Sequence, residues 1–225
     1  MPEKQIKSRQ RVADHGEVFT SEREVKAMCD LVAQECERID SRFLEPACGD
    51  GNFLAEILSR KLAVVSKKYK KSAYDWERYS LLALGSLYGV DILSDNCEIC
   101  RERLFGIWNS EYVKVCKKEC NDSARNSAKF ILSLNIVCGN ALSLRRVDEN
   151  QEDTAEPIVF SEWSFPRNDA FIYRKDYTFD ELVNADEKQK KEDEQISLFG
   201  NDEPDDEGRF ISEYKCHYRR LGENG

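Results

Sequence analysis

The sequence predicts an α/β protein with a doubly wound sheet and helices on both faces. Residues 43–54 combine an apolar segment, a Gly-x-Gly turn and an apolar run with helical spacing. Residues 87–92 form a second short apolar stretch that carries Asp91 near its end, and residues 135–142 read as a third strand and turn. Helical patterns separate these stretches, which is typical of parallel strands joined by helices.

The loop in residues 43–54 is a candidate ligand site. Glycine accepts positive φ and lets a ligand approach the bare backbone, while the following helix presents free N–H groups. Glu45 and Pro46 end the strand, and Asp50 lies between the two glycines. We expect Asn52 to be the N-cap of the helix.

The length and composition predict one domain with additions. The chain has 225 residues, of which 40% are hydrophobic, enough to build a core. Its net charge is −9, but residues 186–207 hold ten acidic and three basic residues, which leaves −2 for the remainder. The net charge therefore neither supports nor excludes a nucleic-acid partner.

Four segments are expected along the chain. They are a basic N-terminal arm (1–14), the α/β domain (15–183), an acidic disordered segment (184–208) and a C-terminal strand and tail (209–225). The arm is either a frayed terminus or a phosphate contact. No apolar run approaches the roughly 18 residues of a membrane span, so we expect a cytoplasmic protein without a membrane partner.

Helical spacing predicts the helices of the domain. A helix over 22–39 has Thr20 or Ser21 as its N-cap, and Glu24 completes a capping box with Ser21. The first strand is followed by a helix to about residue 69. Further helical patterns cover 74–87, 95–116 and 121–134.

Nine scattered cysteines, an odd number, favour reduced thiols over a disulfide scaffold. Cys97 and Cys100, and then Cys116 and Cys120, have spacings found in zinc sites. On a continuous helix the two pairs are several turns apart and do not form one tetrahedral site. We expect buried, small apolar side chains, with zinc as the alternative if the helix breaks.

Residues 45–53 resemble motif I, E-P-x-x-G-x-G-x-F, of the DNA methyltransferases that modify amino groups. In that family the motif binds S-adenosylmethionine, so the resemblance implies this cofactor and a Rossmann-like class I methyltransferase fold. The implied cofactor contacts in this stretch are Glu45, Pro46, Ala47, Gly49, Gly51, Asn52 and Phe53.

Residues 16–20 resemble motif X of the same family, placed before motif I as in its γ-type order. The resemblance implies that Phe19 and Thr20 hold the methionine end of the cofactor; Ser21 stands where the family has proline. Taken alone, Phe19 also fits a hydrophobic staple.

Two further segments continue the resemblance in order. Asp91 resembles motif II, whose carboxylate accepts hydrogen bonds from ribose hydroxyls; the alternative is a helix N-cap, for which Ser94 is the better candidate. The segment from Gly51 to Asp91 is about twice the usual length of roughly 20 residues, so an inserted helix is expected. Asn140 and Ala141 resemble motif III, where the polar side chain reaches the adenine ring.

Motif IV, [DNS]-P-P-[YFW], does not occur in the sequence. In the family it accepts hydrogen bonds from the amino group of a flipped base and stacks an aromatic ring on that base. Residues 157–166 stand at the expected distance, and Glu162 and Trp163 are the candidate acceptor and stacker. The alternative is a strand end with a capping Glu and a core Trp.

The resemblance favours a DNA adenine methyltransferase, the kind of enzyme used in restriction–modification. The alternative is a catalytically silent relative, or one half of a split enzyme with a partner subunit. Arg174 and Lys175, beside Tyr173 and Tyr177, are either nucleic-acid contacts or protective charges on an edge strand.

One apolar island lies in the acidic segment. Residues 195–199 resemble the pentapeptide Q-[LI]-S-L-F by which bacterial replication and repair proteins dock on the sliding clamp. Gln195, Leu198 and Phe199 are therefore candidate clamp contacts, with a segment that docks on the core as the alternative. Apolar alternation returns over 209–221 and predicts a last strand that rejoins the sheet.

Overall fold

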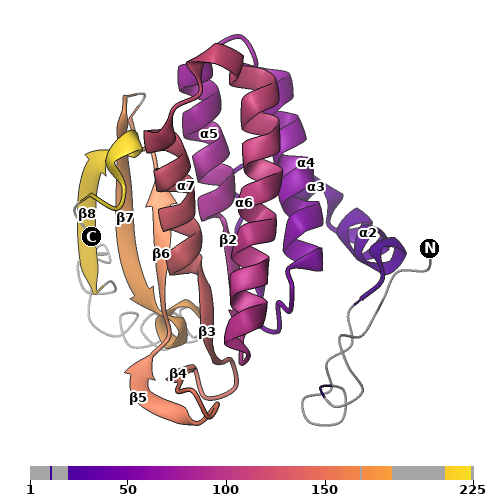
Figure 1. The fold of residues 1–225 in the computed structure, drawn as a ribbon, viewed down its shortest axis with the longest axis vertical. Helices are drawn as coiled ribbons and strands as arrows, with labels where there is room; N and C mark the ends of the chain where they lie inside the picture. The colour runs from indigo at the N-terminus through magenta and orange to yellow at the C-terminus, as the bar shows by residue number, and fades with distance from the viewer. Residues whose placement is uncertain (1–10, 12–19, 168, 184–210, 224–225) are drawn as a thin grey trace, which may run out of the picture.

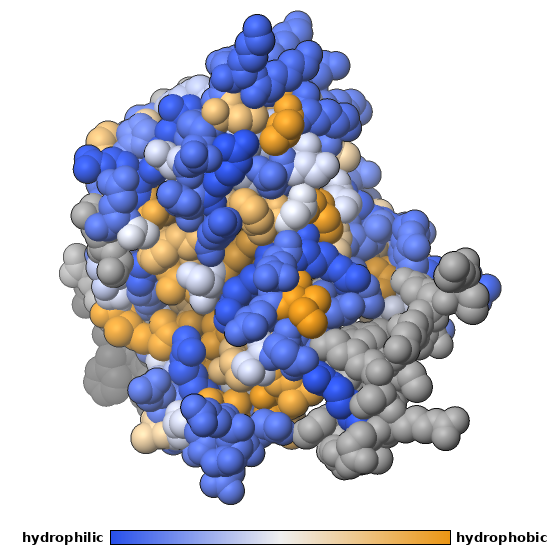
Figure 2. All heavy atoms as spheres, viewed as in Figure 1, coloured by the Kyte–Doolittle hydropathy of each residue, from blue (hydrophilic) through white to orange (hydrophobic). Residues whose placement is uncertain are grey.

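The computed structural model describes residues 11, 20–167, 169–183 and 211–223. They form a mixed α/β protein in which a layer of long helices packs on a small parallel sheet, with a second sheet beside it (Figure 1). On the face seen in Figure 2, hydrophilic and hydrophobic side chains are interspersed.

Three parallel strands form the part of the sheet that the sequence predicted. β1 (Phe43–Glu45) pairs with β2 (Leu87–Asp91), and β2 pairs with β3 (Ile136–Asn140). β2 is the middle strand and is buried over most of its length. The carboxyl ends of all three strands therefore meet at one edge of the sheet.

The remaining strands are antiparallel. β4 (Arg145–Val147) and β5 (Asp153–Pro157) form a hairpin on β3, which the sequence reading did not predict. β6 (Val159–Ser164), β7 (Phe171–Thr178) and β8 (Ser212–His217) form a separate three-stranded sheet. β8 confirms the predicted last strand, although it joins this second sheet.

The helices follow the predicted pattern with one break. A capping box of Ser21 and Glu24 starts the first helix, and Val32, at φ −120°, interrupts the expected helix over 22–39. The inserted helix before β2 is present as α5. The described helices are α2 (Glu22–Leu31), α3 (Ala33–Cys36), α4 (Asn52–Tyr69), α5 (Ala73–Gly85), α6 (Ser94–Cys116) and α7 (Asp122–Asn135), with short 3₁₀ turns η1 (Lys117–Glu119) and η3 (Tyr218–Arg220).

The long helices α4 to α7 share one apolar cluster with one face of the sheet, which differs from the expected helices on both faces. The opposite face, which carries Tyr88 and Val90, packs on Phe160 of β6 and on Phe179. Residues 179–183 are helical and lie on this opposite face. β6 and this segment bury the second face, so a full helical layer is not needed to cover it.

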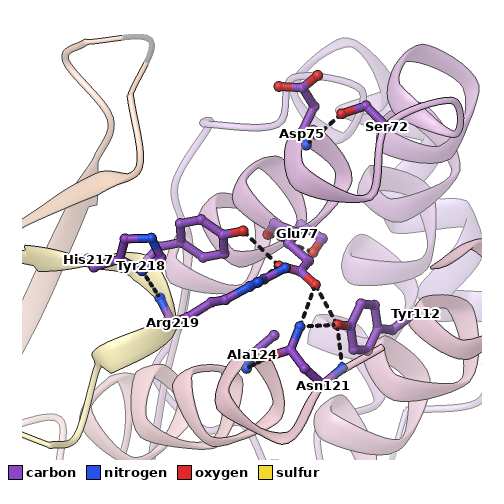
Figure 3. Close-up of polar contacts among 10 residues, drawn as sticks. Ser72, Asp75, Glu77, Tyr112, Asn121, Ala124, His217, Tyr218 and Arg219 are labelled. Carbon is purple, nitrogen blue, oxygen red and sulfur yellow. Dashed lines mark hydrogen bonds and ion pairs between the residues drawn. The ribbon is translucent and has the colours of Figure 1, made fainter. Parts of the chain in front are cut away.

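The C-terminal segment is tied to the helices by Glu77 of α5, whose side chain is fully buried (Figure 3). Its carboxylate accepts hydrogen bonds from the Tyr218 hydroxyl and the Arg219 Nε, both at 2.7 Å. The Tyr112 hydroxyl and the Asn121 amide donate to its other oxygen. Four donors from three parts of the chain thus satisfy one buried carboxylate.

One residue of the expected N-terminal arm is described. The Arg11 guanidinium contacts both carboxylate oxygens of Asp95 on α6, at 2.8 and 3.2 Å. This bidentate geometry suits an arginine–carboxylate pair. Arg11 is therefore ion-paired to the body of the protein.

Candidate cofactor-binding cleft

A cleft of about 530 Å³ lies at the carboxyl ends of β1, β2 and β3. Each strand contributes the loop that follows it, and α2 closes one side. It is lined by Thr20, Val25, Met28, Glu45, Pro46, Ala47, Cys48, Gly49, Asp50, Asn52, Phe53, Asp91, Ile92, Leu93, Asn96, Gly139, Asn140, Ala141 and Leu142. Every described residue that the motifs nominated for the cofactor is in this set except Gly51.

The loop after β1 depends on two glycines with positive φ. Gly49 has φ 52° and Gly51 has φ 84°, a region that glycine occupies without the penalty of a Cβ atom. Gly51 is the N-cap of α4, so the expectation that Asn52 caps this helix is wrong. Asn52 is the first helical residue, and its side chain accepts a hydrogen bond from Arg103 at 2.5 Å.

Asp91 joins the loops that follow β1 and β2. One carboxylate oxygen accepts a hydrogen bond from the Gly49 N–H at 2.9 Å, and the other accepts from the Leu93 N–H at 2.9 Å. The Asn96 amide adds a contact of 3.2 Å. The alternative capping role does not fall to Ser94, because Leu93 is the N-cap of α6 and has no side-chain cap bond.

Glu45 provides a second carboxylate in the cleft, at the end of β1. Burial raises the pKa of Glu45, and a hydrogen bond from the Ala47 backbone partly offsets this effect. A carboxylate in such a setting gains from a cationic ligand that replaces its lost hydration.

The loop after β3 forms the third wall. The Asn140 side-chain oxygen accepts a hydrogen bond from the Leu142 N–H at 3.0 Å, and its nitrogen donates to Asp153 at 3.1 Å. These bonds use one donor and one acceptor position of the amide, which offers two of each. Asn140 therefore retains hydrogen-bonding capacity toward the cleft.

A group of free thiols includes Cys48, which lines the cleft. Cys48, Cys97 and Cys138 are linked by thiol contacts, and Cys100 lies against both Cys48 and Gly51. The hydrogen bond with Cys100, together with burial, raises the pKa of Cys48 above its ordinary range. This side chain is therefore a neutral thiol at neutral pH. Sequence spacing singled out only Cys97 and Cys100, which share α6, because Cys48 and Cys138 come from other elements.

The two cysteine pairs with zinc-like spacing lie at opposite ends of α6, so they do not form one zinc site. α6 runs unbroken over 23 residues, so Cys97 and Cys100 are about 24–28 Å from Cys116 at its other end. Cys120 follows η1 at that same far end. Within the described ranges, no three His, Cys, Asp or Glu side chains are arranged to hold a metal ion.

Glu162 and Trp163 lie away from the cleft. Glu162 is 3.3 Å from Arg42, just before β1, and Trp163 packs on Gly85, just before β2. These contacts place both residues at the amino ends of the parallel strands. The cofactor loops lie at the carboxyl ends of the same strands, which are three to five residues long, so the two ends are separated by on the order of 15 Å. Trp163 is buried, as the core alternative expects, and the structure does not bring either residue to the cofactor loops.

In β7, the Arg174 side chain of the basic and aromatic segment makes contacts within the protein. β7 is the middle strand of its sheet, so the edge-strand interpretation is wrong. Arg174 donates to Asp176 at 2.8 and 2.6 Å and lies over the Tyr214 ring. Burial raises the pKa of Asp176, but the hydrogen bonds from Arg174 and Ser161 outweigh it and hold that pKa below its usual value.

Several candidates lie outside the described residues, namely Phe19 of the motif X resemblance and Gln195, Leu198 and Phe199 of the clamp resemblance. In the part of the chain that the structure describes, none of the helices has the length and apolarity that a membrane crossing requires.

Comparison with known proteins adds no relative. The chain matches no family model, no curated protein and no solved structure.

Proposed function

We propose that this chain binds S-adenosylmethionine in the cleft at the ends of β1, β2 and β3 and belongs to the DNA methyltransferase-like proteins. One observation carries the proposal. Residues nominated from four separate motifs, spread from Thr20 to Ala141, line one cleft. In open α/β sheets, ligands bind outside the carboxyl ends of the strands.

The chemistry of the cleft suits this cofactor. Asp91, at the end of β2, offers a carboxylate to the ribose hydroxyls, and Glu45 offers one to the ammonium of the methionine end. The apolar side chains of Ile92 and Leu93 provide a surface for the adenine ring. A volume of about 530 Å³ lies within the usual range of small-molecule sites.

The proposed reaction is methyl transfer to the amino group of adenine in DNA, with the base flipped out of the duplex toward the cleft. This part rests on the motif resemblance. Such a reaction needs a hydrogen-bond acceptor for the amino group close to the methyl group.

The second candidate is a cofactor-binding module that does not transfer the methyl group alone. The location of Glu162 and Trp163 favours it, because both contact residues at the amino ends of the strands. In this reading a partner subunit supplies the acceptor and the stacking ring for the base.

Calorimetric titration tests the binding proposal. S-adenosylmethionine and S-adenosylhomocysteine should each bind with one site per chain, and ATP, which shares the adenosine but lacks the amino-acid end, should bind far more weakly. If neither of the first two ligands binds to folded protein, the proposal is wrong.

A tritiated methyl-transfer assay on mixed genomic DNA separates the two candidates. Transfer by the purified chain that survives Glu162→Ala and Trp163→Ala supports an enzyme whose base acceptor lies elsewhere. Loss of methyl transfer in both variants, while cofactor binding is retained, would support a catalytic role for Glu162 and Trp163. No transfer by wild type that binds cofactor favours the module.

A further inference from the structure

Two consecutive side-chain hydrogen bonds link Arg11 to the cleft. The Arg11 guanidinium donates to the Asn96 Oδ1 at 3.2 Å, and the Asn96 Nδ2 donates to Asp91 at 3.2 Å. Asn96 and Asp91 both line the cleft. Arg11 lines a separate hollow, which shares Ile92 and Leu93 with the cleft. Arg11 therefore reaches the cleft through Asn96.

Three donors hold the Asp91 carboxylate. Two are the backbone N–H groups of Gly49 and Leu93, each at 2.9 Å, and the third is the Asn96 amide. The backbone donors are fixed by their loops, but an asparagine side chain can turn about two bonds. The position of the third donor therefore depends on what holds the Asn96 side chain.

Arg11 determines which end of the Asn96 amide faces Asp91. A guanidinium only donates hydrogen bonds, and a carboxylate only accepts them. A reversed amide would place its N–H groups against Arg11 and its oxygen against Asp91, and both contacts are unfavourable. Asn96 is 1% exposed, so bulk water does not replace these partners. One orientation of the amide thus satisfies both neighbours.

Arg11 is itself oriented by Asp95, the neighbour of Asn96 on α6. The two terminal nitrogens of its guanidinium contact the two Asp95 oxygens at 2.8 and 3.2 Å, and one of these nitrogens also bonds Asn96. This forked geometry fixes the plane of the guanidinium. The Asp95 side chain is 49% exposed, so the ion pair adds little to stability. Its main effect is to aim a donor at Asn96.

We propose that Arg11 is a positioning residue of the cleft, which acts through Asn96 to hold the Asp91 carboxylate in place for its ligand. The inference rests on the proposed function, in which that ligand is the ribose of S-adenosylmethionine. It gives a residue of the basic N-terminal arm a role other than the expected phosphate contact. Because coupling between two contacts is reciprocal, a ligand that holds Asp91 also favours the bound position of Arg11.

Calorimetric titration with S-adenosylhomocysteine measures the effect on the cleft. Arg11→Ala should weaken binding roughly five- to tenfold, and an affinity within about twofold of wild type overturns the proposal. Arg125→Ala is the matched control and should bind as wild type does. The Arg125 side chain is 27% exposed, pairs with Asp122 and donates to Asn109, but it lies on α7 and does not line the cleft.

A double-mutant cycle tests whether Arg11 acts through Asn96. Asn96→Ala should weaken binding by itself, and Arg11→Ala/Asn96→Ala should lose no more than Asn96→Ala does. Added guanidinium ion, far below denaturing concentrations, should restore part of the affinity of Arg11→Ala but not that of Asn96→Ala, with sodium chloride at the same ionic strength as the control. Additive losses, or equal recovery in both single variants, overturn the proposal.

Amide hydrogen exchange of the ligand-free protein tests the positioning without a ligand. The N–H groups of Gly49 and Leu93 should exchange faster in Arg11→Ala than in wild type, and Arg125→Ala should leave them unchanged. If wild type binds no S-adenosylhomocysteine but this difference is present, the proposed function is wrong and Arg11 still positions Asp91. Exchange in Arg11→Ala that equals wild type at both amides overturns the positioning role, whatever the ligand does.

Discussion

The carboxylate of Asp91 accepts a hydrogen bond of 2.9 Å from the backbone N–H of Gly49, which lies 42 residues earlier in the chain. This bond fixes the loop after β1 against the end of β2. The same carboxylate also accepts from the Leu93 N–H. Asp91 therefore sets the shape of two cleft walls and still borders the cleft itself.

Asp91→Asn should weaken cofactor binding roughly 10- to 100-fold, because hydrogen bonds to a charged group contribute about 1.5–3 kcal/mol. The amide also has a single acceptor oxygen, so Gly49 or Leu93 loses its partner. Calorimetry with S-adenosylhomocysteine measures the change. Glu119→Gln, an exposed carboxylate at the opposite end of α6, is the matched control and should bind as wild type does. An Asp91→Asn affinity within about twofold of wild type would argue against the assigned role.

Gly51→Ala should destabilise the protein by about 1–3 kcal/mol. Gly51 has φ 84°, and a Cβ atom there would lie 2.6 Å from the Cys100 sulfur. Gly106→Ala is the control, since a Cβ at that helical position meets no atom within 4 Å and removes a glycine from the middle of α6. Chemical denaturation should show opposite signs for the two changes.

Cys100→Ala in the Gly51→Ala background should recover only part of the loss. The double variant relieves the contact with the sulfur but leaves alanine at positive φ. Full recovery of stability would mean that backbone strain at position 51 is negligible. No recovery would mean that the contact of the added Cβ with the Cys100 sulfur is negligible.

Apolar periodicity sufficed to predict the parallel strands and the cleft at their ends. Short apolar stretches separated by helices predict parallel strands, and the final residues of parallel strands meet at one edge of the sheet. Local signals were also enough for the capping box of Ser21 and Glu24. These features depend on neighbouring residues or on a simple topology.

Other features depend on contacts that the sequence does not encode locally. Glu162 and Trp163 follow a predicted strand, but β6 runs antiparallel to β7 in a second sheet, which carries them to the amino ends of the parallel strands. The N-cap of α4 is Gly51 and not the predicted Asn52, because the loop has a positive φ at the glycine. The hairpin of β4 and β5 is largely exposed and polar, so it lacked an apolar pattern.

Arg219→Ala should cost about 1.5–3 kcal/mol, because it removes a charged hydrogen-bond donor from the buried carboxylate of Glu77, while the Arg219 side chain itself is 37% exposed. Arg220→Ala, at the next residue, should cost much less than Arg219→Ala, since Arg220 and its partner Glu223 are both exposed. Urea denaturation of both variants measures the difference. Hydrogen exchange over 212–223 should rise in Arg219→Ala alone. Equal losses in the two variants would show that the Glu77 network does not anchor the C-terminal segment.

Lys61 is a fully buried lysine on α4 whose ammonium position is surrounded by backbone and hydroxyl oxygens. Its Nζ donates to the Ile39 carbonyl at 3.1 Å, to the Ser86 hydroxyl at 2.6 Å and to the Ser41 carbonyl. Burial lowers the pKa of Lys61 to about 7, whereas an unfolded chain has a lysine pKa of about 10.4. Between these values the unfolded chain binds a proton that the folded chain lacks, so the contribution of Lys61 to stability rises with pH.

The difference in unfolding free energy between wild type and Lys61→Met should therefore shift in favour of wild type as pH rises above about 7, by at most about 1.4 kcal/mol per pH unit. Below that pH the difference should be flat, since the lysine is then protonated in both states. The cysteines contribute the same pH dependence to the stability of both proteins, so their contribution cancels in the difference. Lys114→Met replaces a lysine that is 75% exposed and should show no such trend. Denaturation curves at several pH values from 6 upward decide the matter, and a flat difference for Lys61→Met would mean that the buried lysine stays charged in the folded protein.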